Sequence, residues 1–94
     1  MRHCFRNICV KIETSLDWLE VGGELTKQLN RLPFNYDLRR LIHNIDVMVT
    51  DLSKLEVEAR RTKKYTLRVE EQLRIINEAI DRLEKLILIA NLMS

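Results

Sequence analysis

The apolar positions in the middle of the chain recur at alternating steps of three and four residues. They are Leu38, Leu41, Ile45, Met48, Leu52, Leu55 and Ala59. This spacing lines the side chains up along one face of an α-helix. A second row, Ile42 and Val49, widens that face. The pattern predicts a helix over 36–61 that contacts two neighbouring elements.

The C-terminal third shows the same steps and predicts a second long helix over 64–92. Its stripe consists of Val69, Leu73, Ile76, Ile80, Leu83, Ile87 and Ala90. Beyond Lys85 the polar face of this helix disappears. A helix that is apolar on all sides requires burial on all sides, so we expect an oligomer interface here. Its predicted residues are Leu86, Leu88, Ile89, Leu92 and Met93.

The N-terminal third is less regular, but its apolar residues still follow helical steps and predict a helix over 3–32. They include Phe5, Ile8, Ile12, Leu16, Leu19, Leu25, Leu29 and Leu32. The pair Gly22-Gly23 weakens this helix and marks either a bend or a close helix crossing. Alternatively, Thr14 or Ser15 caps a fresh helix and leaves the preceding residues as a separate segment.

Three helices of similar length with short connections predict one domain over 1–94. Pro33 ends the first helix because its ring disfavours the α conformation at Leu32, and Asn35 or Asp37 caps the second. With 2 Gly and 1 Pro, the chain holds little material for the turns of an all-β fold. The expected class is all-α: an up-down-up antiparallel bundle of three long helices, four-helix-bundle-like and completed by oligomerisation or by a partner.

Motifs for catalysis or cofactor binding are absent from the sequence, so we expect a protein that is not an enzyme and has no cofactor and no metal. Cys4 and Cys9 lack the partners of a zinc site and are interpreted as reduced thiols. His43 is interpreted as a boundary residue of the central helix. The chain has neither a signal-peptide pattern nor about 20 consecutive apolar residues. We therefore expect a cytoplasmic protein that does not associate with membranes.

Positive charge is concentrated around the second predicted turn, although the net charge of the chain is only +2. Up-down-up topology would place this turn beside the start of the first helix. The candidate nucleic-acid-binding residues are then Arg60, Arg61, Lys63, Lys64, Arg68, Arg2, Arg6 and Lys11. Such a cluster attracts phosphates by long-range attraction and counterion release. The alternative is a solvated corner without a ligand.

From Leu25 onward, the order of features resembles the accessory variability determinant (Avd-like) family of diversity-generating retroelements and the related four-helix proteins of ribosomal RNA intervening sequences. The resemblance rests on a Pro turn at Arg31-Leu32-Pro33-Phe34, a helix from Leu38 to Ala59, a basic turn, and an apolar helix end that begins Leu83-Glu84-Lys85-Leu86. It implies a ring-like homo-oligomer, a pentamer in that family, that binds a reverse transcriptase and template RNA or DNA. Those proteins have a fourth helix after the apolar run, whereas this sequence ends at Ser94. A neighbour would therefore have to cover 86–93.

Two functional hypotheses follow from these observations. The first is a non-enzymatic accessory protein of a diversity-generating retroelement, a homo-oligomer that binds a reverse transcriptase and nucleic acid through basic surface. The second is a structural helical interaction module that does not bind nucleic acid. Affinity for RNA or DNA that falls steeply with salt distinguishes the first from the second.

Overall fold

The computed structural model describes residues 3–5, 8–62 and 66–93. The body of the protein consists of three helices, which confirms the all-α class. The elements are β1 (His3–Phe5), β2 (Ile8–Val10), a single 3₁₀ turn η1 (Ser15–Asp17), α1 (Trp18–Asn30), α2 (Tyr36–Thr62) and α3 (Thr66–Met93). None of the helices in these ranges offers an apolar stretch long enough to cross a membrane.

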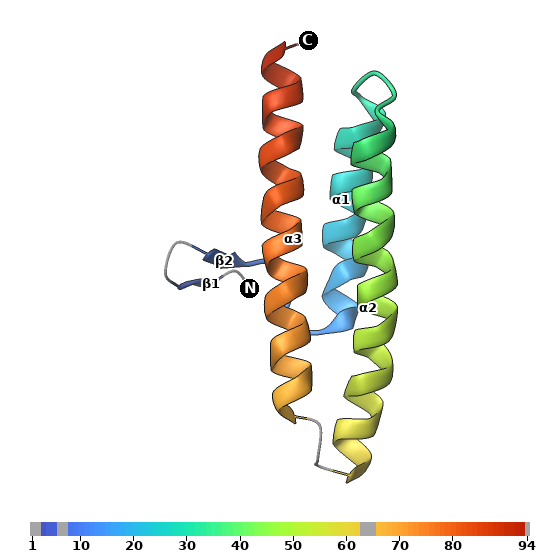
Figure 1. Cartoon of the computed structure of the whole chain (residues 1–94), viewed down its shortest axis with the longest axis vertical. Coiled ribbons are helices and arrows are strands. Elements are labelled where there is room, and N and C mark those ends of the chain that lie inside the picture. Colours follow the sequence, from blue (N-terminus) through green and yellow to red (C-terminus); the bar gives the residue numbers. More distant parts are fainter. Residues whose placement is uncertain (1–2, 6–7, 63–65, 94) are drawn as a thin grey trace.

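The two long helices α2 and α3 pack against each other along their length, and α1 lies against both (Figure 1). In this view α1 and α3 run upward and α2 runs downward. The antiparallel strands β1 and β2 form a small hairpin beside α3 (Figure 1). The molecule is elongated, 49 Å along its longest axis. This length agrees with helices of 27 and 28 residues at about 1.5 Å per residue.

The prediction of one helix over 3–32 is wrong for the residues before Trp18. Residues of β1 and β2 pair with each other, and α1 begins only at Trp18. A short apolar segment fits helical and extended periodicities equally well, so the spacing of Phe5 and Ile8 did not distinguish them. The alternative of a fresh start near Thr14 is correct. The Asp17 carboxylate accepts hydrogen bonds from the backbone N–H groups of Glu13 at 2.8 Å and Thr14 at 3.1 Å.

The connection between α1 and α2 follows the local chemistry of its residues. The N–H groups of Arg31 and Leu32 bond to carbonyl groups of the last turn of α1, and Pro33 follows immediately. Asn35 is the N-cap of α2, because its Oδ1 accepts the N–H groups of Asp37 at 2.9 Å and Leu38 at 3.2 Å. The predicted range 36–61 is confirmed by α2. The range 64–92 agrees with α3, although residues 64 and 65 lie outside the described residues.

A single hydrophobic core lies between the helices. It contains the central residues of the predicted stripes, together with Ile12 from the segment before α1 and Trp18 from its first turn. Its buried members are Ile12, Trp18, Leu25, Leu29, Leu38, Ile45, Val49, Leu52, Ile76, Ile80, Leu83 and Ile87. Because α2 contributes residues that face both neighbours, the double stripe on this helix is explained by its central position.

Candidate interaction surfaces

The predicted basic end lies where α2 ends and α3 begins. Arg60 and Arg61, in the last turn of α2, are exposed, as is Arg68 near the start of α3. The guanidinium of Arg61 lies 3.9 Å from the Glu58 carboxylate in a solvent-exposed pair, which contributes little to stability. Four further predicted residues lie outside the part of the chain that the structure describes: Arg2, Arg6, Lys63 and Lys64.

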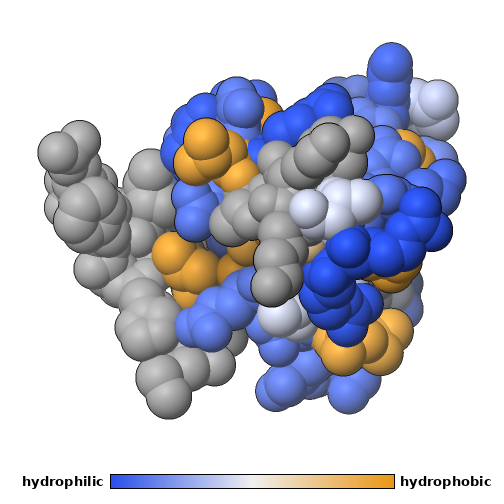
Figure 2. Space-filling model, turned by 90° about the horizontal axis from the view of Figure 1, so that it is seen from below, coloured by the Kyte–Doolittle hydropathy of each residue, from blue (hydrophilic) through white to orange (hydrophobic). Residues whose placement is uncertain are grey.

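The surface at this end is mixed rather than uniformly basic. Figure 2 views the molecule from this end and shows strongly hydrophilic residues interspersed with hydrophobic ones. Leu67, in the first turn of α3, and Leu16, in η1, are largely exposed. Leu16 shares a depression with Arg60 and Glu56, and Glu56 accepts hydrogen bonds from the main chain and the hydroxyl of Ser15. Cations, a carboxylate and apolar groups are therefore close neighbours here.

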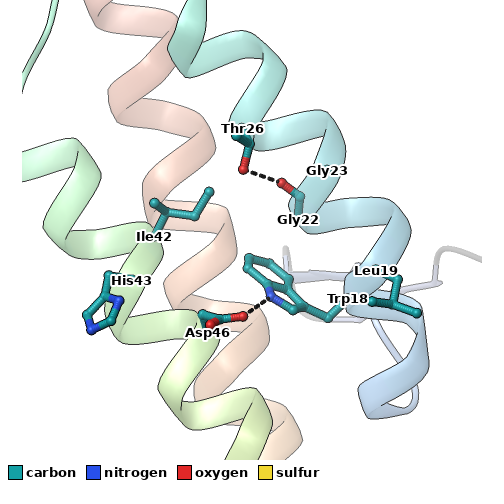
Figure 3. Close-up of a pocket in the computed structure, with 8 residues that line it drawn as sticks. All are labelled: Trp18, Leu19, Gly22, Gly23, Thr26, Ile42, His43 and Asp46. Atoms are coloured by element: carbon teal, nitrogen blue, oxygen red, sulfur yellow. Dashed lines mark hydrogen bonds between the residues drawn. The ribbon is translucent and has the colours of Figure 1, made fainter.

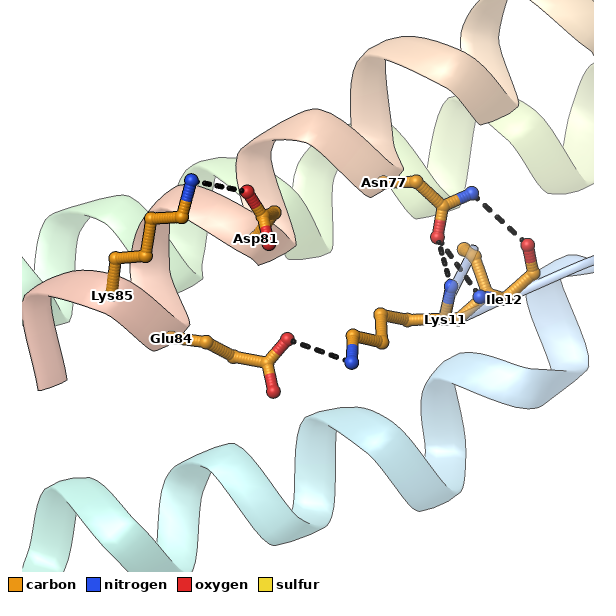
Figure 4. A network of polar contacts seen from close by, with 6 residues as sticks. All are labelled: Lys11, Ile12, Asn77, Asp81, Glu84 and Lys85. Carbon is orange, nitrogen blue, oxygen red and sulfur yellow. Dashed lines mark hydrogen bonds and ion pairs between the residues drawn. The ribbon is translucent and has the colours of Figure 1, made fainter. Parts of the chain in front are cut away.

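The expectation that Lys11 belongs to the basic end is wrong. Lys11 lies beside the middle of α3, where its Nζ is 3.5 Å from Glu84 Oε1 and its side chain is only 13% exposed (Figure 4). The expectation depended on a continuous helix that started near residue 3. The segment before α1 instead crosses α3 at Asn77. Lys11 therefore lies beside a point of α3 that is about eleven residues, or roughly 16 Å, from the start of that helix.

This crossing is held by Asn77, the one buried polar residue among those described, at 2% exposure. Its Oδ1 accepts the N–H groups of Lys11 at 2.7 Å and Ile12 at 2.9 Å (Figure 4). Its Nδ2 donates to the carbonyl groups of Ile12 at 3.0 Å and Leu73 at 2.8 Å. One carboxamide thus satisfies polar groups of the segment that follows β2 and fixes that segment against α3.

The predicted oligomer-interface residues are all on the surface. Leu86, Leu88, Ile89, Leu92 and Met93 have exposed fractions between 40% and 83%. The intervening Ile87 is 2% exposed and belongs to the core. The C-terminal part of α3 thus has one covered side and an apolar remainder that faces solvent.

The exposed apolar residues of α3 divide between two sides of the helix. Leu88 lines a groove with Lys11 and Gln28, on the side where α1 lies. Leu86, Ile89 and Met93 follow at steps of three and four and occupy a different side. Ile75 and Arg82 lie on the same stripe further down the helix. This stripe, defined by Ile75, Arg82, Leu86, Ile89 and Met93, is called the outer stripe below.

A second groove lies between α1 and α2, and Trp18 is among the residues that line it (Figure 3). The indole Nε1 donates to Asp46 Oδ1 at 3.0 Å. An added Cβ at Gly22 would come within 2.7 Å of this ring, whereas one at Gly23 would meet nothing within 4 Å. The Gly pair therefore marks a close approach of the Trp18 ring to the helix rather than a bend. His43 lines the same groove and is exposed.

Two polar anchors, the Asn77 carboxamide and the pair of the Trp18 indole with the Asp46 carboxylate, were not predicted from the sequence. Asn77 was detectable in principle as a polar residue next to the core position Ile76, although its partners lie 65 and 66 residues away. Comparison with models of known families, with curated proteins and with solved structures finds no match.

Proposed function

We propose that this protein is a non-enzymatic helical interaction protein that self-associates through the outer stripe of α3. The observation that carries the proposal is the exposure of Leu86, Ile89 and Met93 on one side of a helix whose neighbouring side belongs to the core. Exposed apolar patches on small proteins mark interaction surfaces. Their burial would stabilise an assembly by about 25 cal/mol per Å² of apolar surface removed from water.

A second copy of the same chain fits this surface better than a strongly charged partner. Asp81 and Lys85 lie beside the stripe and form an ion pair with each other at 3.1 Å, so the border carries little net charge. A two-fold contact requires a patch that is complementary to itself. Apart from Arg82, the outer stripe is apolar, and the ion pair beside it is neutral overall, which agrees with that requirement. Association of this kind would also complete the four-helix-like packing expected from the sequence.

The mass of the full-length chain in solution tests self-association. Light scattering over a range of concentrations should give a multiple of the 11.2 kDa chain mass. Replacing Leu86 and Ile89 by Lys should shift the mass to that of a monomer while the far-ultraviolet circular dichroism stays helical. Leu19→Lys changes a leucine on α1 that is more exposed than either residue and should leave the mass unchanged. A monomeric native chain at every concentration would overturn the proposal.

The second candidate function adds nucleic-acid binding to this assembly. It is favoured by the exposure of Arg60, Arg61 and Arg68 at the same end of the molecule. Each copy in an oligomer would present these cations, so that several weak phosphate contacts act together. This role corresponds to the accessory protein of a diversity-generating retroelement, with a reverse transcriptase as partner and RNA or DNA as template.

A salt titration of RNA and DNA binding tests this second function. Three phosphate contacts, each contributing roughly 0.7 to 0.9, should give a slope of log affinity against log salt of roughly −2 to −3 per copy. Replacing Arg60, Arg61 and Arg68 by Gln should flatten the slope. The control replaces Lys27, Arg31 and Arg40, at the opposite end of the molecule, by Gln and so removes the same amount of charge. Equal effects of the two triple variants, or no binding at low salt, would favour the structural module alone.

A further inference from the structure

The groove between α1 and α2 combines apolar side chains with a single acid (Figure 3). Its volume is about 510 Å³, which lies within the range of small-ligand sites. Trp18, Leu19 and Ile42 supply apolar surface to its lining. Among the described residues that line it, Asp46 is the one acid, and no lysine or arginine is present. The groove therefore favours a ligand that is apolar and positively charged.

The groove is open in its middle because Gly23 has no side chain. A Cβ added at Gly23 would meet nothing within 4 Å. Leu19, Gly23 and Thr26 follow at steps of four and three residues, so they share one face of α1. Ile42 and Asp46 are one helical turn apart on α2 and contribute to the lining from that helix (Figure 3). The space at Gly23 thus lies between two rows of side chains, one of which carries the carboxylate.

Asp46 retains hydrogen-bonding capacity after it has fixed the Trp18 ring. Its Oδ1 accepts the indole N–H at 3.0 Å, whereas a carboxylate can accept about four hydrogen bonds. None of the ion pairs between described residues involves Asp46, and the residue is exposed. The Thr26 hydroxyl donates to the Gly22 carbonyl at 2.8 Å and so does not compete for this carboxylate. A cationic donor on a ligand would form a charge-assisted hydrogen bond here.

We propose that this groove binds a small primary amine that carries an apolar ring. The ammonium group would donate to Asp46, and the ring would cover the open surface at Gly23 and lose contact with water there. A protein partner fits less well, because stable protein interfaces involve roughly 20 to 30 residues on each side, whereas eight described residues line this groove. The site includes no residue of the outer stripe and does not depend on self-association.

Trp18 provides the readout for binding, because it is the single tryptophan of the chain and lines the groove. Titration of the full chain with phenethylamine should give a saturable change in its emission, with a dissociation constant of about 1 mM, a typical affinity for a ligand of this size. Phenylpropionate keeps the ring but replaces the ammonium by a carboxylate, so it should bind more weakly by about tenfold or more. Equal responses to both compounds, or no saturation up to about 10 mM phenethylamine, would overturn the proposal.

The contribution of the carboxylate is tested by Asp46→Asn. This variant keeps the oxygen that accepts the indole N–H but removes the charge, so the affinity for phenethylamine should fall by about tenfold or more. The matched control is Asp51→Asn, which removes the same charge at an exposed position of α2 outside the groove and should change the affinity by less than about twofold. Equal weakening by both variants would show a general attraction of cations to α2 and would overturn the proposal.

The contribution of the open surface is tested by Gly23→Leu, which fills the groove. Because a Cβ at this position has no neighbour within 4 Å, the variant should keep the circular dichroism of the native chain and lose the saturable change in emission. Unchanged binding would place the amine elsewhere and overturn the proposal. Nα-acetyllysine amide tests the other occupant, a basic side chain of a partner protein, and should bind more weakly than phenethylamine because it lacks the ring. Tighter binding of the lysine derivative would assign the groove to a protein contact instead.

Discussion

The carboxamide of Asn77 forms two hydrogen bonds with the main chain of Ile12, in the pattern of an adjacent β-strand. Its Oδ1 accepts the N–H of Ile12 at 2.9 Å, and its Nδ2 donates to the carbonyl of Ile12 at 3.0 Å. Both residues are buried, so water cannot replace these bonds when the carboxamide is removed. This contact connects the hairpin segment to the helical core and is the main determinant of where that segment lies.

Replacing Asn77 by Ala should therefore lower the free energy of unfolding by about 2 to 4 kcal/mol, because it leaves two N–H groups and one carbonyl without partners. The control is Asn44→Ala, at an exposed position of α2, which should change stability by less than about 0.5 kcal/mol. Urea denaturation followed by circular dichroism measures both. A loss below about 1 kcal/mol at Asn77 would mean that the segment detaches without cost to the core.

Replacing either of the adjacent glycines of α1 by alanine should change the stability of the protein, in opposite directions for the two positions. Gly22→Ala places a methyl group against the Trp18 ring and should destabilise the protein by about 1 to 3 kcal/mol through overpacking. Gly23→Ala meets open space and should stabilise it by up to about 1 kcal/mol through helix propensity. Thermal melts of the two variants provide the comparison, and shifts of the same sign would contradict the close approach of the indole to Gly22.

The central helix should carry much of the stability of the core. Ile45 and Leu52 are both fully buried, and replacing either by Ala should cost about 2 to 5 kcal/mol through lost burial and the cavity left behind. Val47→Ala, at an exposed position of the same helix, is the control for the change in side-chain size. Denaturant midpoints at constant m-value would report these differences. If the Ile45 and Leu52 variants lose no more stability than Val47→Ala, the apolar stripe of α2 does not face the core.

The start of α1 should become less stable in acid. The backbone N–H groups of Glu13 and then Thr14 hold the pKa of the Asp17 carboxyl below its ordinary value of 3.8. A lowered pKa in the folded state stabilises the protein above the ordinary pKa, and this contribution is lost as the pH falls through the folded value. D17N should therefore remove a part of the stability that the native protein loses as the pH falls below the ordinary value of 3.8. Parallel thermal melts of both proteins over this range would detect the difference, and identical profiles would contradict it.

The sequence predicts the two long helices well because each carries a stripe sustained over several turns. Tyr36 begins the second helix as expected. Asn35 was one of two predicted caps, and its hydrogen bonds to the N–H groups of Asp37 and Leu38 select it over Asp37. The N-terminal segment was misassigned because Phe5 and Ile8 fit more than one period, and its position depends on the distant contact of Ile12 with Asn77. Lys11 was misplaced for the same reason.

The candidate site was predictable only where it depends on a single helix. The exposed residues at the end of α3 follow from the loss of the polar face beyond Lys85. Their division into two sides does not, because it requires the position of α1, which places Leu88 in a groove with Gln28. The pairing of β1 with β2 likewise was not indicated by the apolar periodicity.

Trp18 is the single tryptophan of the chain, and its indole lies 7% exposed against Asp46 of the neighbouring helix. Its fluorescence therefore reports specifically on whether α1 is docked. Because α2 and α3 are consecutive in sequence and pack along their length, they can form a helical hairpin before α1 joins them. Stopped-flow refolding monitored by the emission of this one residue would follow the arrival of α1, while circular dichroism follows the helices themselves.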